Sequence, residues 1–286
     1  MRIAGAPITW GVCEVPGWGY QMSPQRVLTE MRQIGLTATE FGPGGWLPEE
    51  PAARAAAVAG FDLQPVGSFF LAVMHDPEQD PIPAVRRELA AFAAAGGEFL
   101  ILAADSGRAG YDDRPTLTEE GWQTLFGNLD RIGQVCREQG VTACVHPHWG
   151  TMVQNVDEVR RVLDHSTVGL CLDTGHLAAG GADVEELTRE YAERVSIVHA
   201  KDVHKRISDG LLRGEITWSE GVKGGMFAPI GQGDIDFRSI VTTLDSVGFD
   251  GYYVLEQDVM LDEEPPAGEG PVEAARASLA ALRALA

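Results

Sequence analysis

Side chains that could bind a metal ion or transfer protons follow four short apolar segments in the second half of the chain. HPHWG supplies His146 and His148, LCLDTGH supplies Asp173 and His176, VHAKD supplies His199 and Lys201, and YVLEQD supplies Glu256. Each segment is predicted to be a β-strand, so each group stands at or just beyond a strand end. A single residue of this kind could be a solvated strand end. Four in succession at matching positions indicate one shared site.

The chemistry of this set favours a divalent metal. Two imidazoles and two carboxylates, from His146, Asp173, His199 and Glu256, form the predicted ligand shell. This mixture suits Mn²⁺ or Co²⁺, with Fe²⁺ or Zn²⁺ as alternatives, better than Ca²⁺ or Mg²⁺. No thiolate belongs to the predicted shell, which disfavours a structural zinc site.

Strand alternation predicts what lies beneath these ligands. Alternate residues of a strand point to the same face. Two positions before the four predicted ligands, the sequence has only small or apolar side chains, namely Cys144, Cys171, Ile197 and Val254. We therefore expect a packed interior layer under a polar mouth. The two cysteines are expected to fill that layer as small buried residues rather than to serve in redox or metal chemistry.

Further polar and aromatic residues are predicted to surround the substrate. His148, His176 and Lys201 can reach the mouth beside the metal, and Lys201 could act as an acid or stabilise an oxyanion. Glu40, in TEFGPGG, could bind substrate hydroxyl groups. Trp10 is a candidate to cover a sugar face, although a tryptophan in a loop can equally brace the loop.

The elements that must position these residues alternate between strand and helix. Strands are predicted at 3–9, 37–41, 62–68, 98–103, 141–146, 167–172, 195–200 and 251–256. Helices are predicted at 23–35, 81–97, 118–140, 155–164, 184–193, 236–247 and 271–285. Alternation of this kind implies a parallel sheet, and eight strands match a (β/α)₈ TIM barrel. A doubly wound open sheet is the alternative, but no GxGxxG turn follows the first strand.

We expect one domain over residues 1–286. The stretch 203–228 is an insertion that is predicted to form a lid or part of one. Residues 259–286 are predicted to be a Pro-, Gly- and acid-rich loop followed by the C-terminal helix.

Composition limits the class of partner. The chain has 286 residues, 44% of them hydrophobic, and a net charge of −20 from 22 basic and 42 acidic residues. Such a surface disfavours binding to a nucleic acid, which depends on Lys and Arg. No apolar run is long enough for a membrane span, and the amino-terminal segment lacks the features of a signal peptide. We expect a cytoplasmic protein with a small-molecule partner.

These motifs carry a family resemblance. APITWGVCE, TEFGPGGWLP, HPHWGTMVQ, CLDTGHLAAGG, VHAKDV, PIGQGDIDF and GYYVLEQD together resemble the xylose-isomerase-like barrels of the sugar isomerase/epimerase superfamily. The opening ITWGVCE and the HPHxGT segment resemble its inosose dehydratase-like members more narrowly. The resemblance implies one divalent metal, held by Glu, Asp, His and Glu at four strand ends. Asp173, His199 and Glu256 match the last three. The family resemblance also implies that the protein forms a homo-oligomer.

One departure from the family pattern bears on the reaction. His146 stands where the first glutamate is usual, and His148 and His176 match histidines of the pattern. Epimerases of the superfamily use two opposed carboxylates, and a metal-bound imidazole is a poor second base. The resemblance therefore implies a metal-dependent dehydratase (a hydro-lyase) acting on a keto-cyclitol, 2-keto-myo-inositol, to give a diketo-deoxy product and water. Lys201, His176, His148 and Glu256 remain open as the proton-transfer groups.

Three alternatives remain. A metal-dependent isomerase or epimerase of a keto-sugar or inosose is the first. An abasic-site endonuclease on the same barrel is remote, because the charge is acidic. A sugar-binding barrel without enzyme activity is the third.

Overall fold

The computed structural model describes residues 1–286 and closes a parallel sheet into a barrel. The strands are β1 (Arg2–Gly5), β2 (Ala38–Thr39), β3 (Gln64–Pro65), β4 (Gly67–Ala72), β5 (Phe99–Ala104), β6 (Thr142–Val145), β7 (Gly169–Asp173), β8 (Val195–Ala200) and β11 (Tyr252–Leu255). Their order in the sheet is β3-β2-β1-β11-β8-β7-β6-β5-β4.

Val66 closes the barrel between the two ends of that order. Its N–H group donates a hydrogen bond to the carbonyl of Thr39, and its carbonyl accepts one from the N–H group of Phe99. β3 and β4 are separated by this residue alone, so they are two parts of one interrupted strand. The eight-stranded (β/α)₈ barrel predicted from the sequence is thereby confirmed.

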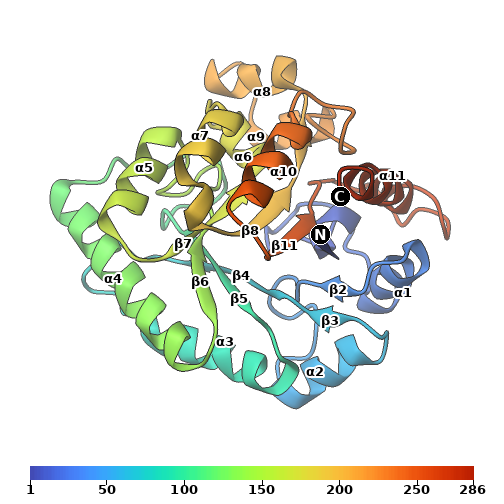
Figure 1. Cartoon of the computed structure of the whole chain (residues 1–286), viewed down its shortest axis with the longest axis horizontal. Coiled ribbons are helices and arrows are strands. Elements are labelled where there is room, and N and C mark those ends of the chain that lie inside the picture. The colour runs from blue at the N-terminus through green and yellow to red at the C-terminus, as the bar shows by residue number, and fades with distance from the viewer.

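Helices surround the sheet (Figure 1). The main ones are α1 (Pro24–Ile34), α2 (Pro51–Ala59), α3 (Ile82–Ala95), α4 (Glu119–Glu138), α5 (Val156–His165), α7 (Val184–Tyr191), α10 (Phe237–Ser246) and α11 (Pro271–Arg283). Ser23, Thr118 and Asn155 cap α1, α4 and α5, each accepting a hydrogen bond from a backbone N–H group of the first turn. All seven predicted helices are present.

Local predictions differ from the structure in three places. The strand predicted at 62–68 lies further along the chain, because β3 starts at Gln64 and β4 ends at Ala72. The first strand ends at Gly5 instead of residue 9, because Pro7 starts a short 3₁₀ helix, η1 (Pro7–Trp10). Proline lacks the N–H group that a continuing strand would need for its ladder. The helix α2 was not predicted. Only Val58 of its residues is buried, so its alanine-rich sequence carries little of the periodic pattern that reveals a helix.

Two apolar cores hold the barrel. The larger comprises 65 buried residues, drawn mainly from the helices and the sheet face that they cover. The smaller comprises 11 residues and includes Cys144, Cys171, Ile197 and Val254. These are the four residues that alternation placed beneath the predicted ligands, so the expected interior layer is confirmed.

The stretch 203–228 folds against the barrel. It contains α8 (Lys205–Leu212), α9 (Trp218–Lys223) and β10 (Phe227–Ala228), and β10 pairs antiparallel with β9 (Asp202–Val203). Trp218 is fully buried. The helix α8 packs on the short helix α6 (Thr174–Ala179), which follows β7. Whether the segment opens and closes as a lid stays a prediction.

Asp202 anchors the loop that follows this segment. Its carboxylate accepts hydrogen bonds from the backbone N–H groups of Val203, Gly231, Gly233 and Ile235, at 2.8–3.1 Å. A Cβ atom on Gly233 would lie 2.3 Å from Oδ1 of Asp202, so only glycine allows this approach. The backbone N–H groups of the GQGD glycines therefore bind a carboxylate of the protein itself.

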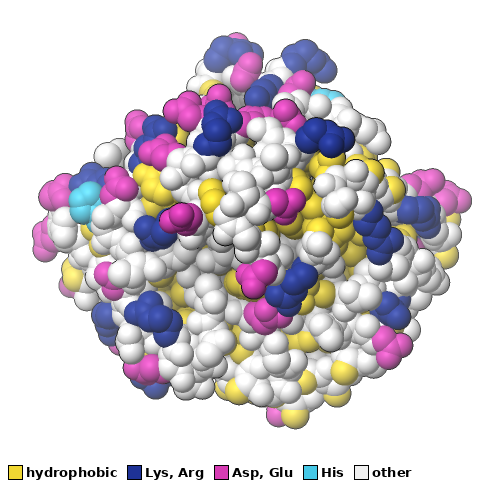
Figure 2. Space-filling view, in the orientation of Figure 1, with side chains coloured by type: hydrophobic (Ala, Val, Ile, Leu, Met, Phe, Trp, Pro, Cys, Tyr) yellow, Lys and Arg dark blue, Asp and Glu magenta, His cyan; other side chains and the backbone are white.

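The surface carries charges of both signs. On the face shown in Figure 2, lysine and arginine side chains are interspersed with aspartate and glutamate. None of the helices combines the length and the apolar character that a bilayer crossing requires.

The Asp202 anchor yields a stability prediction. Asp202→Ala should lower the free energy of unfolding by about 3 kcal/mol, because it leaves four N–H groups, including those of the buried Val203 and Ile235, without their charged acceptor. Urea denaturation followed by circular dichroism measures this. Asp113→Ala, at an exposed aspartate, is the matched control and should change the value by less than about 0.5 kcal/mol. Equal effects of the two substitutions would contradict the anchoring role.

Candidate active site

The four predicted ligands meet at the carboxyl ends of neighbouring strands. β6, β7, β8 and β11 are adjacent in the sheet, which brings together His146, Asp173, His199 and Glu256. Their potential ligand atoms all lie within 4.8 Å of one another. His146, Asp173 and His199 are buried, and the Glu256 side chain is 12% exposed. The geometry can hold one metal ion.

Several atoms of this cluster lack hydrogen bonds although they are buried. Nδ1 of His199 lies 2.7 Å from Oε2 of Glu256 and 3.7 Å from Oδ2 of Asp173. Despite these short distances, neither Nδ1 of His199 nor Oε2 of Glu256 forms a hydrogen bond of acceptable geometry. Buried polar atoms are normally paired. Convergence of unpaired donor atoms on one point fits a bound cation.

The charge balance around the cluster also fits a cation. Glu40, Asp173 and Asp258 are at most 7% exposed, and Glu256 stands beside them. Lys201 lies 2.7 Å from Asp258, 3.3 Å from Glu256 and 3.4 Å from Asp173, measured from Nζ to the nearest carboxylate oxygen. Burial opposes a charge on His199, but Cys171, Glu256 and Glu40 outweigh it and raise the pKa of this imidazole well above its usual value. Lys201 and His199 can together supply two positive charges to four carboxylates, and uncompensated buried charge is costly.

Burial and neighbouring charges set the protonation of these groups. Burial raises the pKa of Glu256 to about 7 and lowers the pKa of His146 to about 4. Burial also opposes the charge on Lys201, but the carboxylates of Asp173, Asp258 and Glu256 outweigh it and raise its pKa above the usual value. His146 is thus neutral, as a ligand must be, and Lys201 is an ammonium.

Glu40 contacts His199 from the opposite side of that ring. Its Oε1 lies 2.8 Å from Nε2 of His199, so the imidazole donates through Nε2 and turns Nδ1 toward the cluster. A carboxylate partner of this kind fixes both tautomer and orientation of a metal-binding histidine. The sequence predicted Glu40 as a substrate contact and missed this pairing, because 159 residues separate the two.

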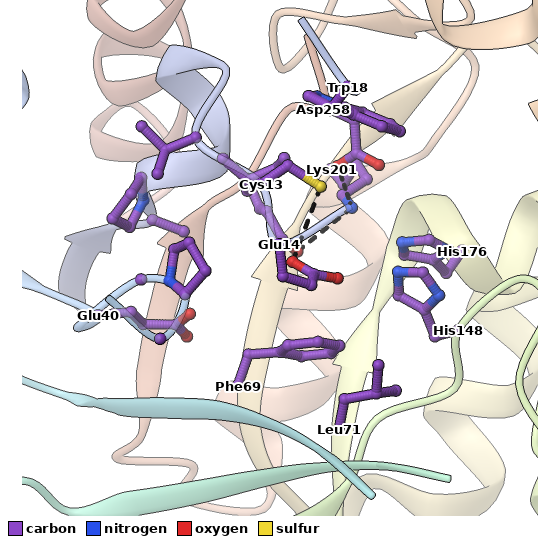
Figure 3. A pocket seen from close by; sticks show the side chains of 18 of the residues that line it. Cys13, Glu14, Trp18, Glu40, Phe69, Leu71, His148, His176, Lys201 and Asp258 are labelled. Atoms are coloured by element: carbon purple, nitrogen blue, oxygen red, sulfur yellow. Dashed lines mark hydrogen bonds and ion pairs between the residues drawn. The ribbon is translucent and has the colours of Figure 1, made fainter. Parts of the chain in front are cut away.

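A cavity of about 250 Å³ opens beside the cluster. Figure 3 shows Glu40 on one side and His148 and His176 on the other, with Phe69 and Leu71 along its edge. Lys201, Glu256 and Asp258 line it as well, whereas His146 and Asp173 do not. The predicted mouth residues Glu40, His148, His176 and Lys201 are therefore brought together around one space.

Trp10 does not agree with its predicted substrate role. Its side chain is fully buried, and its Nε1–H group donates to Glu30 of α1 at 2.9 Å. It braces η1 against α1 instead of facing the cavity. Trp18 lines the cavity in its place, with Tyr111 in edge-to-face contact at 6.2 Å between ring centroids. No feature of the sequence distinguished Trp18 from Trp10.

Cys171 lies nearer to the cluster than its predicted packing role required. Its thiol forms a second group with the imidazoles of His146 and His199, with the potential ligand atoms within 4.8 Å of one another. It lies two residues before Asp173 on β7, so its side chain points to the same face. The alternation of residues along β7 already places the Cys171 thiol on the same face as Asp173, but the sequence analysis predicted only a packing role for it.

Comparisons with known proteins agree with the barrel. A sequence profile described as xylose isomerase-like TIM barrel matches residues 28–285. Inosose dehydratase of Lacticaseibacillus casei is 30% identical over 279 residues, which cover 94% of this chain and 91% of that protein. Inosose dehydratase of Clostridium perfringens is 28% identical over 284 residues, which cover 96% and 93%.

Solved structures share the fold at low sequence identity. An L-ribulose 3-epimerase superposes with a TM-score of 0.70 at 15% identity, covering 99% of this chain and 94% of that one. The IOLI protein, solved with a binding zinc atom, superposes with a TM-score of 0.70 at 15% identity, covering 100% and 98%.

The cluster predicts stabilisation by a divalent metal. Mn²⁺ added to chelator-treated protein should raise the free energy of unfolding by about 2.7 kcal/mol at a hundredfold excess over its Kd. His146→Ala should lose most of this gain, whereas His165→Ala, on the exposed end of α5, should keep it. Thermal denaturation with and without Mn²⁺ measures the difference. Equal gains in the two variants would show that His146 does not bind the ion.

Proposed function

The chain belongs to the xylose isomerase-like TIM barrel family as an inosose dehydratase-like member, and on this premise we propose that it is a metal-dependent dehydratase of a keto-cyclitol. The proposed reaction converts 2-keto-myo-inositol to a diketo-deoxy product and water. Relatives named inosose dehydratase that align over more than 90% of this chain support the assignment.

One observation carries the choice of dehydration over epimerisation. Among the four residues of the cluster, only Glu256 lines the cavity. His146 belongs to the same cluster, but its imidazole contacts Asp173 at 3.1 Å and does not line the cavity. The pair of opposed metal-shell carboxylates that epimerisation would use is therefore incomplete, whereas dehydration needs one base and one acid.

His146, Asp173, His199 and Glu256 would hold the metal. When bound, the ion supplies Lewis-acid polarisation of the substrate ketone, which acidifies the neighbouring C–H bond. The ligand set favours Mn²⁺ or Co²⁺, with Fe²⁺ or Zn²⁺ as alternatives. The IOLI protein, which shares this fold, was solved with a binding zinc atom, and this supports a divalent ion in the present chain.

The chain supplies groups for the two proton transfers. Glu256, whose pKa burial raises to about 7, can accept the proton from the carbon beside the ketone. Lys201, an ammonium 3.3 Å from Glu256, can give a proton to the hydroxyl group that leaves from the next carbon. The C–H electron pair forms the new double bond as the C–O bond breaks. Water departs, and the resulting enol becomes the second ketone.

Turnover of 2-keto-myo-inositol tests this function. We expect a product lighter by one water molecule and a new diketone absorbance, both requiring added Mn²⁺ or Co²⁺. Lys201→Met should lower kcat by about 10²-fold or more, because it removes a proton-transfer group. Conserved mass with solvent deuterium incorporation would indicate the isomerase or epimerase alternative. Full activity after chelation of all metal would contradict the proposal.

The Glu40 contact makes a separate prediction about metal affinity. Glu40→Gln should weaken binding of Mn²⁺ about 10- to 100-fold, since the amide no longer holds His199 as a charged acceptor does. Glu14→Gln is a matched control, because Glu14 lines the same cavity but bonds to Tyr111 instead. Calorimetric titration with Mn²⁺ measures both affinities without reference to turnover. Equal affinities in the two variants would refute the positioning role.

A further inference from the structure

The backbone of Trp149 contacts two cavity histidines with opposite polarity. Its carbonyl oxygen lies 2.8 Å from Nδ1 of His148, and its N–H group donates to Nδ1 of His176 at 3.2 Å. A carbonyl can only accept a hydrogen bond, and an N–H group can only donate one. The two contacts therefore impose different requirements on the two imidazoles.

His148 must carry its proton on Nδ1. Only a protonated Nδ1 can donate to the Trp149 carbonyl. In a neutral imidazole the other nitrogen is then an acceptor. The ring lines the cavity, and no protein group occupies its Nε2 atom. His148 thus presents a lone pair to whatever occupies the cavity (Figure 3).

His176 has the reverse arrangement. Its Nδ1 accepts the N–H group of Trp149, so this nitrogen holds a lone pair and the proton resides on Nε2. The ring also lines the cavity, and its Nε2–H group is free of protein partners. His176 thus presents a hydrogen-bond donor beside the acceptor of His148.

Packing holds both rings in these orientations. Their centroids lie 3.9 Å apart, and the indole of Trp218 stacks on His176 at 4.8 Å with an interplanar angle of 8°. Both histidines and Trp218 are buried, so exchange of ring orientation would require the stack to separate. A ring flip would also break the bond to the Trp149 backbone.

We propose that the Trp149 peptide groups lock His148 and His176 in opposite tautomers, and that the resulting acceptor–donor pair recognises one substrate hydroxyl group. A hydroxyl group can donate to Nε2 of His148 while it accepts from Nε2–H of His176. A ketone oxygen can satisfy only His176, and a C–H group satisfies neither. The identity of the ligand as a cyclic polyol rests on the proposed function, whereas the tautomers do not.

Nuclear magnetic resonance of the ¹⁵N-labelled full chain reads the tautomers directly. Long-range ¹H–¹⁵N correlations distinguish Nδ1–H from Nε2–H imidazoles in alkaline solution, where ordinary histidines are neutral. We expect the Nδ1–H form for His148 and the Nε2–H form for His176. The same tautomer in both rings, or a mixture in either, would overturn the proposal.

An internal reference and two variants make the assignment secure. Nδ1 of His165 contacts the carbonyl of Arg161 at 2.9 Å on the surface, so this ring should also show the Nδ1–H form and serves as the reference spectrum. His148→Asn and His176→Asn each remove one set of signals and identify it. Should either variant fail to fold, His148→Gln or His176→Gln removes the same set of signals and gives the assignment.

Binding of inositol analogues tests the recognition step. Among the monodeoxy derivatives of myo-inositol, one should bind about 10²-fold more weakly than the parent, the loss expected for unsatisfied buried polar groups. That loss should disappear in His148→Asn. If every monodeoxy derivative bound as well as myo-inositol, the recognition step would be wrong. Neither the tautomer measurement nor the binding measurement depends on turnover. If the tautomers were as expected but the protein had no dehydratase activity, the proposed function would be refuted and the tautomer proposal would stand.

Discussion

The site depends on the contacts that the carboxylate of Asp173 makes with its neighbours. Its Oδ2 atom lies 3.1 Å from His146, 3.4 Å from Lys201 and 3.7 Å from His199, and so links the ends of β6, β7 and β8. Its Oδ1 atom accepts the N–H group of His176 at 2.7 Å and caps α6. One side chain therefore aligns the strand ends, starts the next helix and sets the position of a cavity histidine. A neutral side chain here would leave several buried cationic or polar groups unpaired at once.

Closure of the barrel completes the site from the other side. Glu40 follows β2 in the first quarter of the chain, yet its carboxylate reaches His199 on β8. Such an approach requires the sheet to curve back on itself, which the hydrogen bonds of Val66 secure. Nε2 of His199 bonds to Glu40, and this contact turns Nδ1 toward Glu256, whose Oε2 atom lies 2.7 Å away. The orientation of this imidazole is thus a property of the whole barrel.

Much of the site could be predicted from the sequence, because the alternation of residues along a strand and the order of strands along the chain can be read from short segments. The alternation of apolar and polar residues placed His146, Asp173, His199 and Glu256 at neighbouring strand ends. It also placed Cys144 and Cys171 beneath them. The pairing of Glu40 with His199 depends on contacts between distant segments, which no local pattern encodes. The prediction that Trp10 contacts the substrate was wrong for a related reason, since its partner Glu30 belongs to another element. The tautomers of His148 and His176 depend on backbone atoms, which carry no residue-type signal.

The packed interior layer has a consequence for how such barrels diversify. Alanine, cysteine, valine and isoleucine side chains, together with Phe99 and Tyr252, pack the barrel interior under the cluster. The floor of the cavity is therefore fixed by packing, and the depth at which a ligand reacts is fixed with it. Changes in ligand size or shape must arise at the rim, from residues such as Cys13, Glu14 and Leu71. A rim can be remodelled one side chain at a time at little cost in stability, whereas a change in the floor would disturb every strand around it.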